Sequence, residues 1–207
     1  MKLTWLGHSC YLLDDGKSRL VIDPYTPGSV DGLGDIDVEA ERVICTHGHG
    51  DHSFKDAVRI TGDPFTMDLR ALPEFHDECK GRKRGPNNVF IITGSDGVKI
   101  AHMGDIGSMP TREHLEAISE ADAILIPVGG FYTVDAREAK AITDAAGVNI
   151  IVPMHFRSDS FGFDVLSTLD RFTGLFENVT YLEGSSFVVD AGTPAGVIVP
   201  VPEFLKK

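Results

Sequence analysis

Four side chains that can bind a metal ion are gathered in residues 46–52, which read Thr-His-Gly-His-Gly-Asp-His. Histidines two positions apart, just past a strand, can direct their rings to one side because the side chains of extended backbone alternate. The intervening glycines let the backbone bend so that Asp51 and His52 face the same point. Three imidazoles and a carboxylate suit a borderline metal such as zinc, and they exceed what one tetrahedral ion needs. A histidine-rich surface turn is the other interpretation, and the position after a strand and the glycine spacing disfavour it.

Together with residues further along the chain, this segment resembles the metallo-β-lactamase superfamily, whose signature is His-x-His-x-Asp-His. The resemblance extends over nearly the whole chain. Asp23 matches the structural aspartate that ends an early strand in that family. The other matches are a histidine after the signature, an aspartate shared by two metals and a last histidine, here His76, Asp105 and His155.

The resemblance implies a centre of two divalent metal ions, Zn²⁺ first, with Mn²⁺ or Fe²⁺ as alternatives. The implied ligands of the first ion are His47, His49 and His76. The implied ligands of the second ion are Asp51, His52 and His155, with Asp105 shared between both ions. Two ions in such a centre lie about 3.5–4 Å apart, and a water between them ionises near neutral pH. Asp51 is then expected both to bind metal and to orient the hydroxide.

Three further segments look like the branch that contains ascorbate-6-phosphate lactonase and N-acylphosphatidylethanolamine phospholipase D. They are residues 5–9 (Trp-Leu-Gly-His-Ser), residues 80–87 and residues 127–130. The resemblance implies an α/β (α+β) fold, an αββα sandwich of two mixed β-sheets flanked by helices. It also implies a metal-dependent hydrolase that uses a metal-bridged hydroxide on an ester, lactone or phosphodiester bond.

Two other functions share parts of this pattern. One is an iron-dependent oxidoreductase of the persulfide dioxygenase type; the diiron flavoprotein relatives usually carry an acid where this chain has His49. The other is a non-catalytic metal-binding module, which the complete ligand set disfavours because binding alone needs no shared aspartate beside an activated water. Metal analysis with an oxygen-uptake assay separates oxidation from hydrolysis.

Three histidines outside the ligand set need separate interpretations. His8 follows a strand and a glycine. We predict that it lies at the catalytic site, where it contacts the substrate or hydrogen-bonds a metal ligand, and a structural role is the alternative. His102 precedes Asp105 by three residues, which favours a core histidine or one bonded to a ligand carboxylate. His114 lies in an acidic helical segment and is expected to be solvated.

A short basic run follows His76 and predicts an anionic substrate. Four of the 19 basic residues fall within five positions, at Lys80, Arg82, Lys83 and Arg84. Guanidinium groups near a metal site can grip phosphate or carboxylate, although charge runs are also common on solvated loops. Further along, Tyr132 is a candidate proton donor or substrate contact, and its neighbour Phe131 is expected to pack in the core.

Composition places the chain among ordinary globular proteins. Its 207 residues are 42% hydrophobic and 24% charged, which excludes collagen-like and disordered classes and predicts a single domain over residues 1–207. The net charge of −12 makes nucleic acid an unfavourable partner and favours a small molecule. The three cysteines lie at irregular positions, which is typical of a reducing compartment. The sequence has no apolar stretch of about 20 residues and no signal-peptide pattern. These features predict a cytoplasmic protein without a membrane span.

Alternating strands and helices must position these side chains. Strands are predicted over residues 2–6, 10–13, 19–22, 42–46, 88–93, 98–103, 123–128, 149–154, 179–182 and 187–189. Helices are predicted over residues 111–120, 135–146 and 164–172, the second opening with a capping pair, Asp135 and Glu138, and ending at Gly147. The segment 42–46 is interpreted as a buried strand. A faint internal repeat, with one strand running into His47 and another into His155, predicts that both ends lie at one edge.

Overall fold

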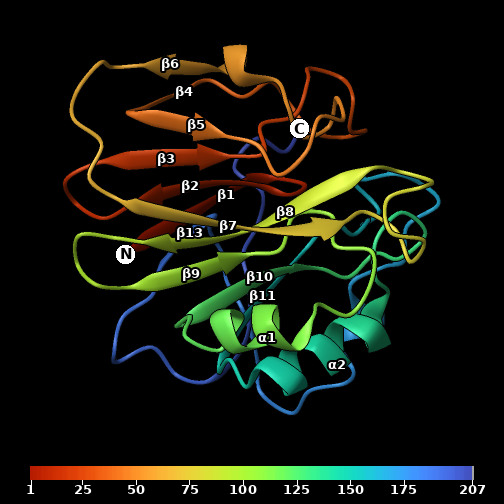
Figure 1. The fold of residues 1–207 in the computed structure, drawn as a ribbon. Helices are drawn as coiled ribbons and strands as arrows, with labels where there is room; N and C mark the ends of the chain where they lie inside the picture. The colour runs from red at the N-terminus through yellow and green to blue at the C-terminus, as the bar shows by residue number, and fades with distance from the viewer. Residues whose placement is uncertain (207) are drawn as a thin grey trace.

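The computed structural model describes residues 1–206, whose strands form two mixed sheets packed on one shared hydrophobic core (Figure 1). The five-stranded sheet has the order β13 (Ser186–Val188), β1 (Lys2–Gly7), β2 (Cys10–Asp14), β3 (Arg19–Ile22) and β5 (Arg42–Ile44). The seven-stranded sheet has the order β12 (Val179–Tyr181), β14 (Gly196–Val199), β11 (Ile150–Met154), β10 (Ala123–Pro127), β9 (Lys99–His102), β8 (Pro86–Thr93) and β7 (Asp68–Phe75). The predicted fold class is confirmed.

The two predicted hairpins form as the turn residues indicate. β2 pairs antiparallel with β3, and the carboxylates of Asp14 and Asp15 accept hydrogen bonds from the turn amides between them. β8 pairs antiparallel with β9 around a turn in which the Gly97 amide bonds the Gly94 carbonyl at 2.9 Å. From β9 onward the sheet is parallel, through β10, β11 and β14, so the carboxyl ends of these strands share one edge.

Helices α1 (Arg112–Ile118) and α2 (Ala136–Ala146) pack against each other on the side of β10 and β11, as Figure 1 shows. The predicted capping box of α2 is confirmed, with Asp135 accepting from the Glu138 amide and Glu138 accepting from the Asp135 amide, both at 2.9 Å. Gly147 ends α2 in the left-handed conformation, with φ 69°. The buried face of α2 carries mostly small side chains, so the helix can lie close to β10. β10 is itself buried along its whole length.

Two sequence predictions about these elements are wrong. The helix expected over residues 164–172 is reduced to α3 (Asp170–Thr173), because the preceding backbone bonds neighbouring segments instead: the Ser167 amide donates to the Gly129 carbonyl at 2.8 Å. The segment 42–46 is not a central buried strand. It forms the three-residue edge strand β5, which is only half-buried because it pairs with β3 alone.

Four strands lack a clear sequence signal, namely β4 (Val38–Ala40), β6 (Val58–Ile60), β7 and β14. β4 and β6 pair with each other beyond β5, beside the short 3₁₀ helix Lys55–Ala57. The sequence does not predict β7, because charged residues and Pro73 interrupt its apolar positions. It forms nonetheless, since β8 pairs with all eight of its residues and an edge strand tolerates proline. Within residues 1–206, no helix is long and apolar enough to span a membrane.

Candidate metal centre

Candidate ligands follow the ends of five strands that converge on one side of the sandwich. His8 follows β1, the loop 46–52 follows β5, His76 follows β7, Asp105 follows β9 and His155 follows β11. The two histidine-bearing strand ends of the predicted repeat therefore do meet. His8 and His155 both have a left-handed backbone, with φ 52° and 53°. Such strain in non-glycine residues persists only where the surrounding structure imposes it.

Asp23, at the end of β3, holds the start of the ligand loop. One carboxylate oxygen accepts from the Thr46 amide at 2.6 Å, and the other accepts from the Thr46 hydroxyl at 2.7 Å and from His52 Nδ1 at 3.0 Å. Burial opposes ionisation of Asp23, but the His52 ring and these hydrogen bonds leave its pKa lowered. The bond to Nδ1 leaves His52 Nε2 free to face the opposite direction.

Asp105 lies at the middle of the cluster. Its Oδ2 atom is 3.0 Å from His76 Nε2 and 3.2 Å from both His52 Nε2 and His155 Nε2. Burial opposes its charged form, yet the neighbouring imidazoles hold its pKa well below the ordinary value. Buried Asn87 fixes the backbone here, since its side chain accepts from the Asp105 amide and donates to the Met103 carbonyl, both at 2.9 Å.

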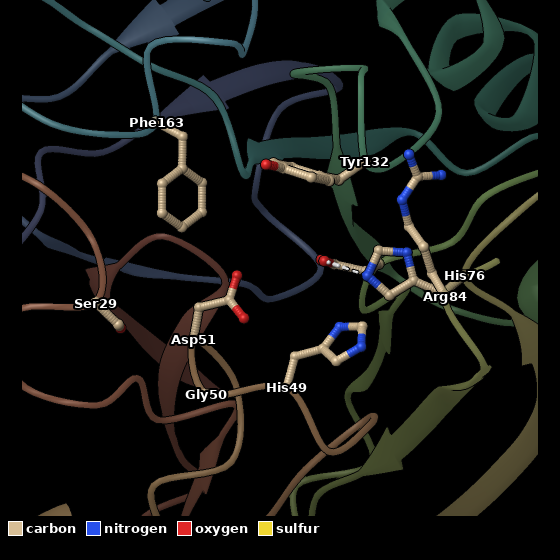
Figure 2. Close-up of a pocket in the computed structure, with 9 residues that line it drawn as sticks. Ser29, His49, Gly50, Asp51, His76, Arg84, Tyr132 and Phe163 are labelled. Atoms are coloured by element: carbon tan, nitrogen blue, oxygen red, sulfur yellow. Dashed lines mark ion pairs between the residues drawn. The ribbon is translucent and has the colours of Figure 1, made fainter.

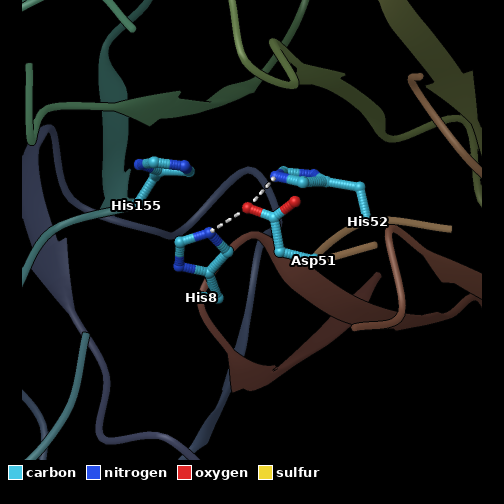
Figure 3. Close-up of side chains that lie close together, drawn as sticks. All are labelled: His8, Asp51, His52 and His155. Carbon is cyan, nitrogen blue, oxygen red and sulfur yellow. Dashed lines mark ion pairs between the residues drawn. The ribbon is translucent and has the colours of Figure 1, made fainter. Parts of the chain in front are cut away.

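Two groups of ligand atoms adjoin Asp105, each with its atoms within 4.8 Å of one another. The first group is His47, His49 and His76, which come from the ligand loop and the end of β7. Its rings lie 4.7–5.1 Å apart between centroids. The second group is Asp51, His52 and His155 together with His8, as Figure 3 shows. The structure thus brings together all seven candidate ligands that the resemblance implies and places His8 beside them.

Many buried nitrogen and oxygen atoms of this cluster have no hydrogen-bond partner among the described residues, and a metal ion would give several of them one. They are both ring nitrogens of His8 and His155, the Nε2 atoms of His47 and His52, Nδ1 of His76 and Oδ1 of Asp105. Each such orphan costs about 1–3 kcal/mol unless something binds it. Burial, the largest cause, lowers the pKa values of His8 and His47 to about 4, so these rings are neutral at pH 7 and able to bind a cation. The residues present therefore fit divalent metal ions.

A pocket of about 410 Å³ opens directly onto the cluster (Figure 2). Its polar floor consists of His49, Asp51, His76 and Asp105. Its walls consist of Ser29, Gly50, Arg84, Tyr132 and Phe163. Ser29 and Phe163 escaped sequence analysis, because nothing in their local sequence places them near the metal-binding segment. The cluster and the pocket form one concave site in which a substrate can reach the candidate ligands.

The basic run is folded around the carboxylate of Asp77, a residue whose turn-forming role the sequence analysis missed. Asp77 accepts four backbone hydrogen bonds, from the amides of Cys79, Gly81, Lys83 and Arg84, at 2.7–3.0 Å. Burial would raise the Asp77 pKa, but these bonds lower it to about 2. An aspartate that bonds amides two or more residues on is a known turn signal, so Asp77 could have been found from sequence.

Of the four basic residues in the run, Arg84 alone lines the pocket. Its Nη2 donates to the Phe131 carbonyl at 2.9 Å, and its guanidinium lies 5.6 Å from the centre of the Tyr132 ring. Lys83 pairs instead with Glu78, and Arg82 Nε donates to the Cys79 carbonyl at 3.1 Å. Lys80 and Arg82 line a separate surface hollow beside Glu78. The sequence prediction treated all four residues alike, and the structure places only one of them at the site.

The other singled-out residues have mixed outcomes. Tyr132 lines the pocket as predicted, but Phe131 does not pack in the core, because 62% of it is exposed. His102 is a buried, satisfied core histidine, with Nε2 bonded to the Ser9 carbonyl at 2.9 Å and Nδ1 accepting from the Gly104 amide. His114 is not merely solvated, since its ring bonds Glu74 at 2.6 Å. Cys10 is fully buried, and burial raises its thiol pKa well above the ordinary value.

Known proteins resemble this chain in sequence and in fold. The family model described as beta-lactamase superfamily domain matches residues 2–155. A UPF0173 metal-dependent hydrolase of Methanoculleus marisnigri is 29% identical, over 87% of this chain and 90% of its own length. A solved structure from Thermotoga maritima is named for a Zn-dependent hydrolase of the metallo-beta-lactamase superfamily. Its sequence is 30% identical to this chain, and the two structures superpose with TM-score 0.74 over 96% of this chain and 97% of the Thermotoga maritima chain. A metallo hydrolase from Ignicoccus hospitalis, 20% identical with TM-score 0.61 over 84% of this chain and 89% of its own, shares the fold.

Proposed function

Because this chain belongs to the metallo-β-lactamase superfamily and is a metal-dependent hydrolase, we propose that it uses two divalent metal ions, Zn²⁺ first, to cleave an ester, lactone or phosphodiester bond of a small anionic substrate. The observation that carries this proposal is the position of Asp105. One of its carboxylate oxygens lies 3.0–3.2 Å from three imidazole nitrogens that belong to two adjacent groups of orphaned donors. A carboxylate there can serve both groups at once.

The chemistry of hydrolysis divides between the bound ions and the protein. Two divalent ions lower the pKa of a coordinated water towards 7 and stabilise negative charge that develops on the substrate. Asp51 lines the pocket beside this position, and an ionised Asp51 can orient the attacking water, since neighbouring histidines hold its pKa well below the ordinary value although burial opposes this. Asp23 and Asn87 act behind these residues by fixing His52 and Asp105.

Arg84 supports the anionic character of the substrate. Among residues 1–206, no carboxylate lies within ion-pair distance of its guanidinium, although the protein carries a net charge of −12. Because its Phe131 contact uses one N–H group, other donors remain available to phosphate or carboxylate. Phe163 and the ring of Tyr132 provide an apolar wall on the same pocket. We propose a substrate with a compact apolar body and one anionic group.

Tyr132 is proposed to donate a proton to the leaving group, with simple substrate contact as the alternative. Its ring lies between Arg84 and Phe163 on the pocket wall, as Figure 2 shows. Tyr132→Phe keeps the ring and removes the hydroxyl, so a proton-donating role predicts a lower kcat for poor leaving groups and little change for good ones. A rise in KM alone would instead indicate substrate contact.

The test loads purified protein with zinc, manganese or iron and pairs elemental analysis with a substrate panel. Esters, lactones and phosphodiesters are compared in pairs that differ by one carboxylate or phosphate group. More than one equivalent of metal, with faster hydrolysis of the anionic member of each pair, is expected. Substoichiometric metal at saturation would refute the two-ion centre, and oxygen consumption without hydrolysis would favour the oxidoreductase alternative.

A further inference from the structure

His8 contacts the candidate metal centre in a way that a structural histidine would not. It is 1% exposed, and neither ring nitrogen has a hydrogen-bond partner. Its Nε2 atom is 3.4 Å from Asp51 Oδ2, and its ring centroid is 4.0 Å from that of His155. Figure 3 shows the ring directed at Asp51, beside His52 and His155. A buried polar ring without a partner is costly, so its orientation towards three candidate ligands needs a cause.

The backbone around His8 is built to hold that orientation. His8 has φ 52°, which is uncommon for a residue with a side chain. Its carbonyl accepts from the Trp5 indole at 2.9 Å and from the His155 amide at 3.4 Å, so the strained residue is tied to both sheets. Gly7 before it has φ 127°, and a Cβ there would come within 2.7 Å of Leu33. The left-handed backbone at His8 thus directs its imidazole into the protein interior.

Resting on the two-ion function proposed above, we propose that His8 is an additional protein ligand of the second ion. Two ligand atoms on one tetrahedral zinc lie about 3.4 Å apart, since zinc binds nitrogen and oxygen at about 2.0–2.2 Å. His8 Nε2 and His52 Nε2 lie 3.4 Å and 3.6 Å from Asp51 Oδ2, close to that separation. With His155 and the shared Asp105, the second ion would then have five candidate protein ligands, against four for the first ion.

The two sites consequently differ in access and in affinity. The pocket is lined by His49 and His76 of the first group and by Asp51 of the second, whereas the three histidines of the second group do not line it. His49 is exposed, and the three histidines of the second site are buried. Sites closed by protein ligands are typical of structural ions, and sites with an open position are typical of catalytic ones. The His8 site is therefore the tight site, and the His49 site is the exchangeable one that meets substrate.

The test titrates metal-free protein with Co²⁺, following visible absorption, and measures cobalt retained after dialysis. The wild-type protein is expected to bind one tight and one weaker equivalent. His8→Asn, chosen because asparagine tolerates a left-handed backbone, should weaken the tight equivalent by at least about 100-fold. His49→Asn should weaken only the other equivalent. His114→Asn, which removes a histidine bonded to Glu74 away from the site, is the matched control and should keep both.

Folding of each variant is checked by circular dichroism. A second variant, His8→Gly, relieves the backbone strain and leaves space for added imidazole, which should restore the tight equivalent. A tight equivalent unchanged in His8→Asn overturns the proposal while leaving the two-ion function intact. If the wild-type protein binds a single equivalent, the two-ion function fails, and loss of that ion in His8→Asn but not in His49→Asn still supports the His8 site. Loss of that ion in His49→Asn but not in His8→Asn overturns the proposal that His8 is a metal ligand.

Discussion

The carboxylate of Asp77 accepts a hydrogen bond from the backbone amide of Arg84 at 2.8 Å, so the residue directly after His76 holds the arginine that faces the pocket. The same carboxylate accepts from three other amides of the intervening loop. Asp77 thus fixes the candidate anion-binding residue Arg84, and Asp77 itself directly follows the candidate metal ligand His76. The proposed metal ligand His76 and the proposed anion-binding residue Arg84 therefore lie at the two ends of one hydrogen-bonded turn.

Asp77→Asn should therefore reduce use of anionic substrates without removing metal. An amide nitrogen cannot accept hydrogen bonds, so at least two of the four loop bonds are lost. We expect a higher KM for anionic substrates, a smaller change in kcat and unchanged metal content. Glu78→Gln is the control, since Glu78 pairs with Lys83 on the exposed side of the loop. Equal effects of the two substitutions would show that loop charge, and not the Asp77 turn, matters.

Arg84→Gln should weaken transition-state binding of phosphorylated or carboxylated substrates by about 1.5–3 kcal/mol, the range for hydrogen bonds to charged groups. Arg82→Gln should have little effect, because Arg82 lies outside the pocket. The measurement is kcat/KM for paired neutral and anionic substrates on metal-loaded protein. Equal losses on both members of a pair would mean that Arg84 shapes the pocket without recognising charge.

Asp105→Asn should lower metal content and hydrolysis together. Its carboxylate faces both ligand groups, and an amide has one acceptor oxygen and no charge to offer them. Elemental analysis and activity are measured on the same dialysed samples. A variant with full metal content and wild-type activity would contradict the shared position of Asp105.

Glu41 stabilises the edge strand that leads into the ligand loop, with a defined pH dependence. It bonds Arg19 of β3 and accepts from the Thr61 hydroxyl at 3.0 Å, and the Arg19 contact is the main cause that lowers its pKa from 4.5 to about 2. This stabilisation is complete above pH 4.5 and is lost as the pH falls towards 2. Glu41→Gln should cost about 1.5–3 kcal/mol of unfolding free energy at pH 7.

Urea unfolding of wild-type protein and Glu41→Gln at several pH values measures this dependence. The difference between the two proteins should shrink below pH 4.5, because there the unfolded wild-type chain binds a proton at Glu41 whereas the folded protein does not do so until about pH 2. A difference that stays constant over that range would show that packing around Glu41, and not its charge, stabilises the edge.

Local patterns determined a large part of this protein from sequence alone. The hairpin turns and the caps of α2 form as predicted, because their hydrogen bonds join residues a few positions apart. The cluster of candidate ligands in residues 46–52 was visible for the same reason. The superfamily is shown and its fold confirmed, whereas the lactonase-like branch and the roles of individual site residues stay predictions.

Tertiary structure decided what depends on contacts between distant segments. β7 forms because β8 pairs with it, and this pairing carries His76 to the site although residues around His76 have no local signal. The packing of the two sheets also brings the residue after β1 to the ligand loop, so that His8 meets Asp51 and His155. The choice of Arg84 over its three basic neighbours follows from the Asp77 turn. Sequence spacing specifies which side chains can bind metal or anions, but their direction is set by the packing of one element on another.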